Sequence, residues 1–212
     1  MTILFLHILY LTAITAEAMT AALAAGRRRM DWVGVCLLGC VTALGGGSVR
    51  DLLLGRYPLV WVEHPSYLLV TAGAALATIA IARLMRRLRT LFFVLDAIGL
   101  VVFTVIGCNI ALAQGLPIVV VIVAGMITGC VGGVLRDVLC NEVPLLFRSE
   151  LYASVSIVTG AIFVGGLALS LPHGLVTAVS FAVGLTFGLT FRLLAIHYKW
   201  EMPKFVYDRD PH

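Results

Sequence analysis

The chain has 212 residues, of which 61% are hydrophobic and only 12% are charged, and its mean hydropathy is +1.05. A soluble domain has about 45–50% apolar and about 25% charged residues, so this composition excludes a protein that hides its apolar side chains in one aqueous core. The formal net charge of +4 is compatible with an anionic partner. The basic residues lie between apolar segments, however, and membrane topology explains that placement without nucleic acid.

A helix needs about 20 apolar residues to cross a bilayer, and seven stretches of the chain meet this requirement. In chain order, the predicted spans are residues 3–25, 32–55, 66–83, 91–113, 117–140, 151–171 and 174–196. The first stretch lacks a preceding basic segment and is too long for the apolar part of a signal peptide, so we expect a retained helix. The predicted fold class is therefore an all-α transmembrane bundle of seven helices, with an exposed tail from His197 onward.

The basic residues orient this bundle, because cytoplasmic loops of membrane proteins are enriched in Lys and Arg. Arg50 and Arg136 fall within spans, and Arg56 lies outside if the N-terminus does. The basic residues that are then on the inside are Arg27, Arg28, Arg29, Arg83, Arg86, Arg87, Arg89, Arg148, Arg192, Lys199, Lys204 and Arg209. The sequence therefore predicts an outside N-terminus and a cytoplasmic C-terminus.

A pattern in the second span returns in the fifth. Residues 44–53 read LGGGSVRDLL and residues 130–139 read CVGGVLRDVL, so Gly-Gly-x-x-Arg-Asp recurs 86 positions later. Upstream, ALAAG at 22–26 is matched with ALAQG at 111–115, an offset of 89 that predicts a shorter connection in the second copy. We therefore expect two three-helix repeats, 1–86 and 87–172, followed by a seventh helix and tail at 173–212.

Repeats of three helices must enter the membrane from opposite sides. Such inverted repeats place substrate or ion sites near the midplane, at discontinuous helices whose ends point inward. The second and fifth helices are predicted to be this broken pair, with Arg50-Asp51 toward the outer face and Arg136-Asp137 toward the inner face. A path between the two Arg-Asp pairs would have pseudo-twofold symmetry.

The glycines of these two helices allow two interpretations. They are Gly45, Gly46 and Gly47 in the first copy and Gly132 and Gly133 in the second. A glycine inside a helix costs about 1 kcal/mol relative to alanine. Small residues in membrane helices commonly permit close packing. Alternatively, the glycines break the helices, and freed backbone groups then line a wet cavity, since non-helical backbone is otherwise not tolerated at membrane depth.

The Arg-Asp pairs also allow two functions. An arginine at the centre of a membrane helix costs about 2.5–3.5 kcal/mol on insertion scales. Neighbouring side chains on a helix diverge by about 100°, so Asp51 and Asp137 are not expected to face the arginines beside them. Arg50 and Arg136 are therefore predicted to pair across helices, either as a stabilising lock or as a pore-lining or gating pair.

Two further acids lie within the spans. Asp96, one turn into the fourth span, is expected near the inner surface, close to the basic residues at 86–89, or else in the pathway. Glu17 lies deeper and is expected to be protonated, paired across the bundle, or exposed to a water-filled cavity. The hydroxyls of Ser48 and Thr128 are candidates for lining the same cavity, although such groups often bond to their own helix.

The chain carries no HExxH, GxSxG or P-loop motif and no carboxylate pair with supporting residues, so an enzyme is not expected. The five cysteines, at positions 36, 40, 108, 130 and 140, lack the spacing of a zinc site. No cofactor and no metal beyond a transient monovalent cation are predicted.

GGGSVRD at 45–51, GGVLRD at 132–137, Pro58, Pro144 and the 3+3+1 layout resemble the trimeric intracellular cation (TRIC) channel family, in particular its bacterial inner-membrane branch. The resemblance implies a homotrimer in the inner membrane whose protomers each hold a hydrophilic, potassium-permeable pore beside kinks in helices two and five. It places the five glycines at the kinks, and it makes the Arg-Asp pairs at 50–51 and 136–137 pore-side charges. Animal members carry Lys-Glu-Val where this chain has Arg-Asp-Leu at 50–52, so that chemistry is not carried over.

Two functions remain open at this point. The first is a passive channel for K⁺ or Na⁺, in which an arginine blocks the path and is released on opening. The second is a carrier for glycine or a similar zwitterion, since bacterial relatives are also labelled glycine transporters; an arginine would bind the carboxylate, and an Asp or Glu17 the amine. The expected partners are further copies of the chain and membrane lipid.

Overall fold

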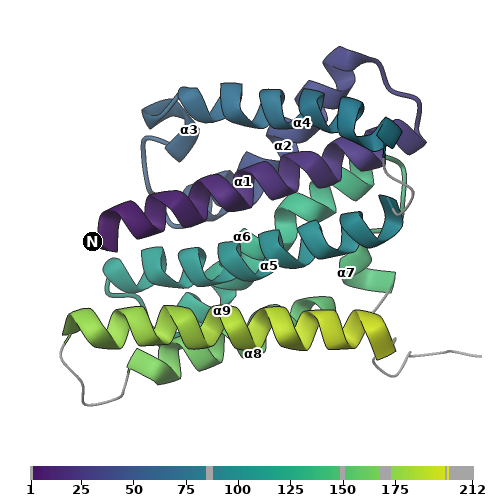
Figure 1. Cartoon of the computed structure of the whole chain (residues 1–212). Helices are drawn as coiled ribbons and strands as arrows, with labels where there is room; N and C mark the ends of the chain where they lie inside the picture. The colour runs from purple at the N-terminus through teal and green to yellow at the C-terminus, as the bar shows by residue number, and fades with distance from the viewer. Residues whose placement is uncertain (1, 85–87, 149–150, 168–172, 199, 201–212) are drawn as a thin grey trace, which may run out of the picture.

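The computed structural model describes residues 2–84, 88–148, 151–167, 173–198 and 200. Within these residues the chain is all-helical, and seven of the helices have sixteen residues or more. Figure 1 shows the long helices lying alongside one another in one bundle. In chain order they and two four-residue helices are α1 (Thr2–Arg27), α2 (Trp32–Leu53), α3 (Val60–Glu63), α4 (Ser66–Leu84), α5 (Leu88–Ala113), α6 (Ile118–Leu139), α7 (Leu145–Arg148), α8 (Tyr152–Leu167) and α9 (His173–Tyr198).

Five helices are long and apolar enough to cross a bilayer. They are the described parts of α1, α2, α5, α6 and α9, at Leu4–Arg27, Trp32–Leu53, Leu88–Ala113, Ile118–Leu139 and Val179–Tyr198. The other two expected spans form shorter apolar helices, Ser66–Ala82 and Tyr152–Leu167. Most of the predicted tail, and the end of the sixth predicted span at 168–171, lie outside the described residues.

Helix bounds recur along the chain at a constant distance. α1 covers residues 2–27 and α5 covers 88–113, while α2 covers 32–53 and α6 covers 118–139, so each bound returns 86 positions later. The offset of 89 expected between α1 and α5 is therefore wrong. The error has a physical origin, because Ala- and Leu-rich helices resemble themselves when shifted by about one turn.

The connections follow the same spacing. Left-handed backbone conformations occur at Arg29 (φ 55°) and Gly115 (φ 70°), and again at Gly55 (φ 64°) and Asn141 (φ 53°). The members of each pair stand 86 positions apart. A left-handed residue just beyond a helix end stops the helix and turns the chain, so the two halves of the chain end their helices with the same backbone device.

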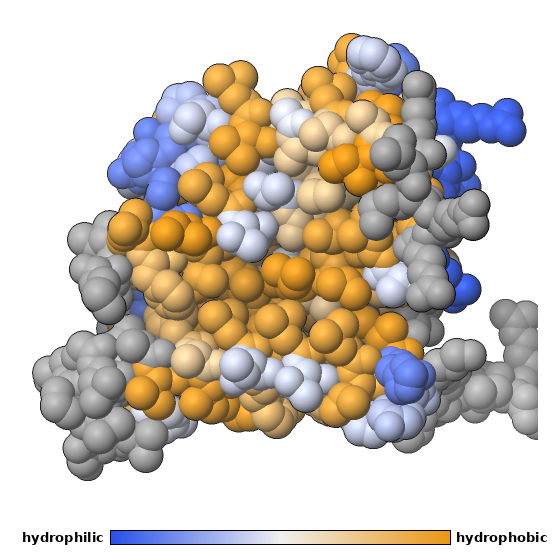
Figure 2. Space-filling view, viewed as in Figure 1, coloured by the Kyte–Doolittle hydropathy of each residue, from blue (hydrophilic) through white to orange (hydrophobic). Residues whose placement is uncertain are grey.

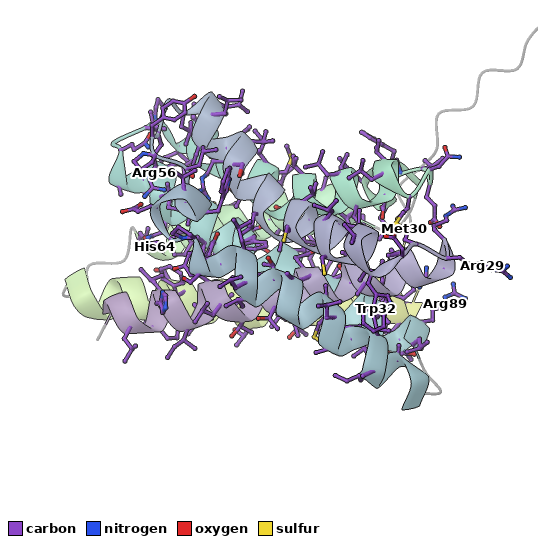
Figure 3. The ribbon with its side chains drawn as sticks, turned by 90° about the horizontal axis from the view of Figure 1, so that it is seen from above. Arg29, Met30, Trp32, Arg56, His64 and Arg89 are labelled. Carbon is purple, nitrogen blue, oxygen red and sulfur yellow. The ribbon has the colours of Figure 1, made fainter. Side chains whose placement is uncertain are left out.

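The helix packing is also similar in the two halves of the chain, and the halves contact each other through α1, α2, α5 and α6. Helix α6 packs extensively against α5 and α2, and α1 packs against α2 and α5. Helix α4 packs against α1 and α2, and α8 packs against α6 and α5. Helix α9 lies against α8 and α5. The two short helices α3 and α7 lie at opposite ends of the bundle (Figure 1). Arg29 and Arg89 project from one end, and Arg56 and His64 lie at the other (Figure 3).

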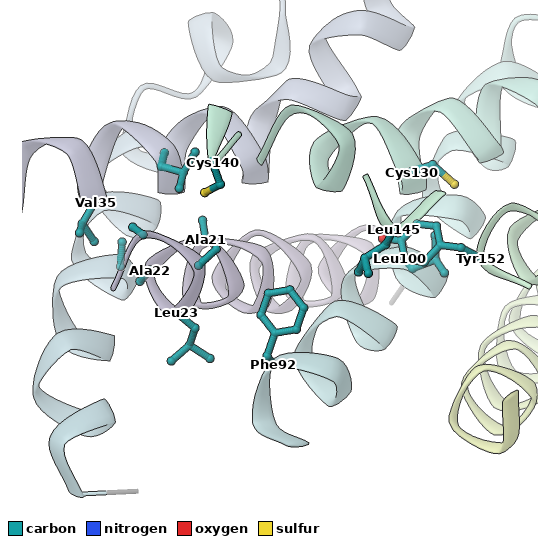
Figure 4. Close-up of a cluster of buried hydrophobic side chains, with 14 of the residues drawn as sticks. Ala21, Ala22, Leu23, Val35, Phe92, Leu100, Cys130, Cys140, Leu145 and Tyr152 are labelled. Carbon is teal, nitrogen blue, oxygen red and sulfur yellow. The ribbon is translucent and has the colours of Figure 1, made fainter. Parts of the chain in front are cut away.

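Apolar side chains cover much of the exterior. Figure 2 shows them as a broad area across the middle of one face, with hydrophilic residues gathered toward the helix ends. Exposed examples are Leu4, Val33, Leu37, Leu69 and Val119. The interior is also apolar, and one cluster joins residues of α1, α2, α5, α6 and α8, among them Ala21, Val35, Phe92, Cys130 and Tyr152 (Figure 4). A helix bundle whose exterior and interior are both largely apolar is typical of a membrane protein.

Candidate functional site

The first glycine of each Gly-Gly pair lies where α2 and α6 cross. A Cβ on Gly46 would collide with the carbonyl oxygen of Thr128, and a Cβ on Gly132 would collide with that of Thr42. These two contacts exchange under the 86-residue offset. Both helices run through their glycines without interruption, so the expectation that the glycines break the helices is wrong. Their role is the alternative one of close backbone approach, because only glycine leaves room for the neighbouring carbonyl.

The second glycine of each pair lies beside an arginine one turn further on. A Cβ on Gly47 would stand 3.7 Å from Nη2 of Arg50, and one on Gly133 would stand 3.5 Å from Nη2 of Arg136. The guanidinium group of each arginine therefore folds back along its own helix and lies over a residue that has no side chain. The three-residue spacing in Gly-Gly-x-x-Arg-Asp thus sets the second glycine one turn from the arginine, within ordinary contact distance of its guanidinium group.

Arg50 and its neighbours form the Arg50 cluster, which consists of Arg50, Asp51, Arg56 and Thr128. Arg50 is 2% exposed, and its Nε and Nη2 atoms donate to Oδ1 of Asp51 at 3.0 and 2.8 Å. Nη1 donates to the hydroxyl of Thr128 at 3.4 Å. Arg56 approaches the same Asp51 oxygen at 3.5 Å. The prediction that Arg50 pairs with an acid of another helix is therefore wrong, because its long side chain curls far enough to meet the adjacent carboxylate.

The Arg136 cluster is larger, and it joins α1, α5, α6, α8 and α9. Its central residue, Arg136, is fully buried. Nε of Arg136 donates to Oδ1 of Asp137 at 2.8 Å, whereas Nη1 donates to Oδ1 of Asp96 at 2.9 Å and to the hydroxyl of Thr20 at 3.0 Å. The ring of Phe92 lies 4.6 Å from the guanidinium carbon. Here both kinds of pairing coexist, with the adjacent acid and across helices.

The two other predicted acids belong to this cluster. Asp96 is fully buried in the protein and pairs with Arg136 on α6. Glu17 is 1% exposed, and its Oε2 lies 3.9 Å from Nη1 of Arg136 and accepts a hydrogen bond from Thr20 at 3.2 Å. Of the three expectations for Glu17, pairing across the bundle is the one that this geometry supports.

Tyr152 and Arg192 complete the cluster. Like Thr20 and Phe92, they were not among the site residues predicted from the sequence. The hydroxyl of Tyr152 on α8 donates to Oδ1 of Asp96 at 3.3 Å. Arg192 on α9 is fully buried, with Nη2 at 3.9 Å from Oδ2 of Asp96 and its guanidinium carbon 4.7 Å from the ring of Tyr152. From the sequence, Arg192 is counted only among the basic residues of the inside set, whereas the structure places it within α9 and buries it. The sequence could have indicated a buried arginine here, because position 192 lies within the apolar span predicted at 174–196.

The short helix α7 is tied to the Arg136 cluster by its first residue. The backbone N–H of Leu145 donates to Oδ2 of Asp137 at 2.9 Å. Asp137 thus binds the guanidinium group through one oxygen and the start of α7 through the other. A second tie at this end of the bundle is the partly exposed ion pair between Arg28 and Glu142, at 3.0 Å.

Not every candidate lies in the two clusters. The hydroxyl of Ser48 donates to the carbonyl of Leu44 on its own helix at 2.8 Å. Ser48 and Gly45 line an apolar hollow of about 350 Å³ beside residues such as Trp61 and Leu68. Among the described residues, no group of three His, Cys, Asp or Glu side chains is placed to hold a metal ion.

Two segments of the chain, residues 7–83 and 93–168, match the family model described as Glycine transporter. The UPF0126 inner membrane protein YadS of Escherichia coli K12 is 40% identical over 196 residues, which are 91% of this chain and 92% of that protein. A UPF0126 membrane protein of Vibrio cholerae is 38% identical over 201 residues, covering 94% and 82% of the two chains.

Solved structures give the same picture. The TRIC trimeric intracellular cation channel orthologue from Rhodobacter sphaeroides is 36% identical, with a TM-score of 0.81 over 90% of this chain and 98% of that one. A second TRIC cation channel structure is 33% identical, with a TM-score of 0.85 over 96% and 98% of the chains. The chain belongs to the TRIC family. It is a multi-pass membrane protein, and its relative in E. coli is named an inner membrane protein.

The TRIC fold extends to more distant members. A trimeric intracellular cation channel from C. elegans, solved with bound Ca²⁺, has a TM-score of 0.59 over 87% of this chain and 90% of its own, at 14% identity. That likeness concerns the fold alone. The two segments matched by the family model begin at residues 7 and 93, the 86-residue spacing that separates the helix bounds of this TRIC protein.

Proposed function

We propose that this TRIC protein is a monovalent-cation channel, selective for K⁺ over anions, with one pathway in each protomer of a homotrimer. The observation that carries the proposal is the pair of buried Arg-Asp clusters, one in the last turn of each of two crossing helices, in a chain that resembles solved TRIC cation channels at 33–36% identity. The three-helix repeats at 1–86 and 87–172 are proposed to insert in opposite directions, with the N-terminus outside and the C-terminus in the cytoplasm.

The pathway proposed here runs from the Arg50 cluster, past the α2–α6 crossing, to the Arg136 cluster. A positive charge in a narrow pore repels cations. Each guanidinium is instead neutralised by an adjacent aspartate, Asp51 or Asp137, and both arginines are almost fully buried. We therefore expect conduction to require that the guanidinium groups move aside while the carboxylates remain as cation-attracting groups. A bend at Gly46 and Gly132 during opening is part of this proposal.

A second candidate is a carrier for glycine or a similar zwitterion. The description of the matching family model favours it, as does the presence of arginines and carboxylates in the same buried cluster. An arginine can bind a substrate carboxylate in a bidentate manner, and a carboxylate such as that of Glu17 can bind an ammonium group. Inverted repeats suit alternating access.

One preparation separates the two candidates. The purified protein is reconstituted into planar bilayers in KCl and, in parallel, into liposomes loaded with glycine. The channel predicts unitary potassium currents that reverse at the potassium equilibrium potential. The carrier predicts saturable counterflow of labelled glycine without unitary currents, and that result would overturn the channel. Protein-free membranes serve as the control in both assays.

A further inference from the structure

The ring of Phe92 contacts one exposed arginine and one buried arginine. Arg27, in the last turn of α1, is exposed, and its guanidinium carbon lies 4.9 Å from the centre of the Phe92 ring. Arg136 is fully buried, and its guanidinium carbon lies 4.6 Å from the same ring centre. Phe92 itself is 5% exposed. The three side chains therefore form a chain of contacts from the surface of the bundle to the centre of the Arg136 cluster.

The exposed end of this chain of contacts borders two hollows, and Arg27 and Leu88 line both of them. One hollow, of about 500 Å³, lies among α1, α2, α4 and the start of α5. The other, of about 450 Å³, also has Arg89 and Phe93 in its wall. Figure 3 shows Arg89 projecting at this end of the bundle. An ion that enters from this end reaches Arg27 first, and the Phe92 ring is the next group in the chain of contacts.

We propose that the ring of Phe92 is the gate at the Arg27 end of the pathway, and that it turns aside to connect the hollows with the Arg136 cluster. The inference rests on the proposed channel function and adds the place at which that channel is closed. Phe92 belongs to the same buried apolar cluster as Ala21 and Leu23 (Figure 4). A constriction lined by apolar side chains excludes water, so a hydrated cation does not pass it.

The contact with Arg136 couples this gate to the rest of the pathway. A guanidinium group over an aromatic face is attracted to the ring, most strongly where water is excluded. The guanidinium group of Arg136 therefore holds the ring of Phe92 in its present position. Conduction in the proposed channel requires this group to move aside, and the ring then loses its buried partner and is free to turn. One movement thus removes both the positive charge and the apolar barrier.

The equivalent positions beside the Arg50 cluster carry different residues. With the 86-residue offset, Leu6 stands in the first half where Phe92 stands in the second, and Ala113 is the counterpart of Arg27. Neither the aromatic ring nor the exposed guanidinium group therefore recurs at these positions. The gate proposed here serves one end of the pathway.

Access of a thiol-reactive cation to the Arg136 cluster tests the gate. In a background with its five native cysteines changed to alanine, Thr20→Cys places a thiol where a hydroxyl contacts Arg136 at 3.0 Å. Ag⁺ is a monovalent cation that reacts with thiols. Phe92→Ala should speed this reaction about tenfold, because the apolar barrier is removed. The measurement is the loss of later maleimide labelling in inside-out and right-side-out membrane vesicles, and the increase should occur only in the vesicles that expose the Arg27 end.

Phe93→Ala is the matched control. Its ring centre lies 5.5 Å from that of Phe92, and its ring faces Arg89 at 5.8 Å, in the wall of a hollow. This variant should leave the Ag⁺ rate within about twofold of the original, because the barrier behind it stays in place. Equal rates for Phe92→Ala and Phe93→Ala, or faster rates in both kinds of vesicle, would overturn the gate. Phe92→Leu keeps an apolar side chain and should react at an intermediate rate; if Phe92→Ala does not fold, an unchanged rate for Phe92→Leu overturns the gate.

Single-channel recording in planar bilayers separates the gate from the channel itself. Phe92→Ala should raise the open probability about tenfold, and Phe93→Ala should leave it unchanged. If the original protein gives unitary currents but the loss of the Phe92 ring changes neither the open probability nor the Ag⁺ rate, the gate is wrong and the channel stands. Absence of unitary currents from the original protein would instead overturn the channel and the gate together.

Discussion

At the scale of single residues, Arg50 and Arg136 occupy equivalent positions but depend on different numbers of partners. A buried guanidinium group is stable only while carboxylates nearby balance its charge. Arg136 has Asp137 and Asp96 within 2.9 Å, on two different helices. Arg50 has Asp51 alone at such a distance, and that carboxylate also faces Arg56. The second half of the protein therefore relies more on its arginine than the first half does.

This difference predicts unequal losses of stability. Arg136→Gln leaves two buried carboxylates without their main partner, and we expect it to cost about 3–5 kcal/mol of folding stability. Arg50→Gln should cost less, because Arg56 still faces Asp51. The measurement is the midpoint of thermal unfolding of the purified protein in detergent. Arg28→Gln, in a partly exposed pair, should change stability by about 0–1 kcal/mol, and equal midpoints for the two buried variants would contradict the prediction.

The sequence identified most residues of the two clusters, but only part of their pairing. Membrane-buried charges are rare, so Glu17, Asp96, Arg50 and Arg136 stood out in apolar stretches. Arg136 pairs across helices as predicted. The contacts of Arg50 and Arg136 with the adjacent aspartates were not predicted, because the side chains were treated as fixed directions on a helical wheel, whereas an arginine is long enough to curl onto the neighbouring residue. The burial of Arg192 was not predicted, because the positive-inside rule already accounts for a basic residue near the end of a span.

At the scale of helices, the close approach of α2 and α6 depends on the absence of a side chain at Gly46 and Gly132. Gly46→Ala should push the helices apart or prevent folding, at a cost of about 1–3 kcal/mol for an overpacked site, because its methyl group would meet the Thr128 carbonyl. Gly47→Ala is the matched control. Its methyl group would stand in ordinary contact with Arg50 at 3.7 Å, and alanine favours the helix by about 1 kcal/mol.

The effects of Gly46→Ala and Gly47→Ala are measured as the yield of monodisperse protein and the midpoint of thermal unfolding. Gly132→Ala should resemble Gly46→Ala, since it meets the Thr42 carbonyl in the equivalent contact. Similar midpoints for Gly46→Ala and Gly47→Ala would show that the crossing tolerates a methyl group. The sequence predicted the glycines' importance but not their role, because a glycine pair has the same appearance whether it interrupts a helix or lets another helix approach.

At the scale of the whole molecule, charge separates the two ends of the bundle. Arg29 and Arg89 lie at one end, and Arg56 lies at the other (Figure 3). Following the positive-inside rule, we expect the first end and the C-terminus to be cytoplasmic. Fusions at the C-terminus test this in bacteria. Green fluorescent protein should fluoresce there and alkaline phosphatase should be inactive, whereas the reverse pair of results would place the C-terminus outside.

The two clusters also differ in sign, which predicts asymmetric conduction in the proposed channel. Among the described residues, the Arg50 cluster holds two arginines for one aspartate, whereas carboxylates outnumber arginines in the Arg136 cluster. The side chain of Arg56 is 37% exposed, so its charge acts on ions that enter from that end. Arg56→Gln should therefore raise the unitary potassium current entering from the Arg56 end about twofold at ~0.1 M salt, because it removes a repulsive charge.

Salt and a charge-conserving variant separate this electrostatic effect from a change of shape. At ~1 M salt the Debye length falls to about 3 Å, so the currents of Arg56→Gln and the original protein should converge. Arg56→Lys keeps the charge and should conduct like the original at both concentrations. A gain that persists at high salt, or that Arg56→Lys shares, would mean that the side chain narrows the entrance by its size, and the difference in sign between the clusters would then have no part in the asymmetry.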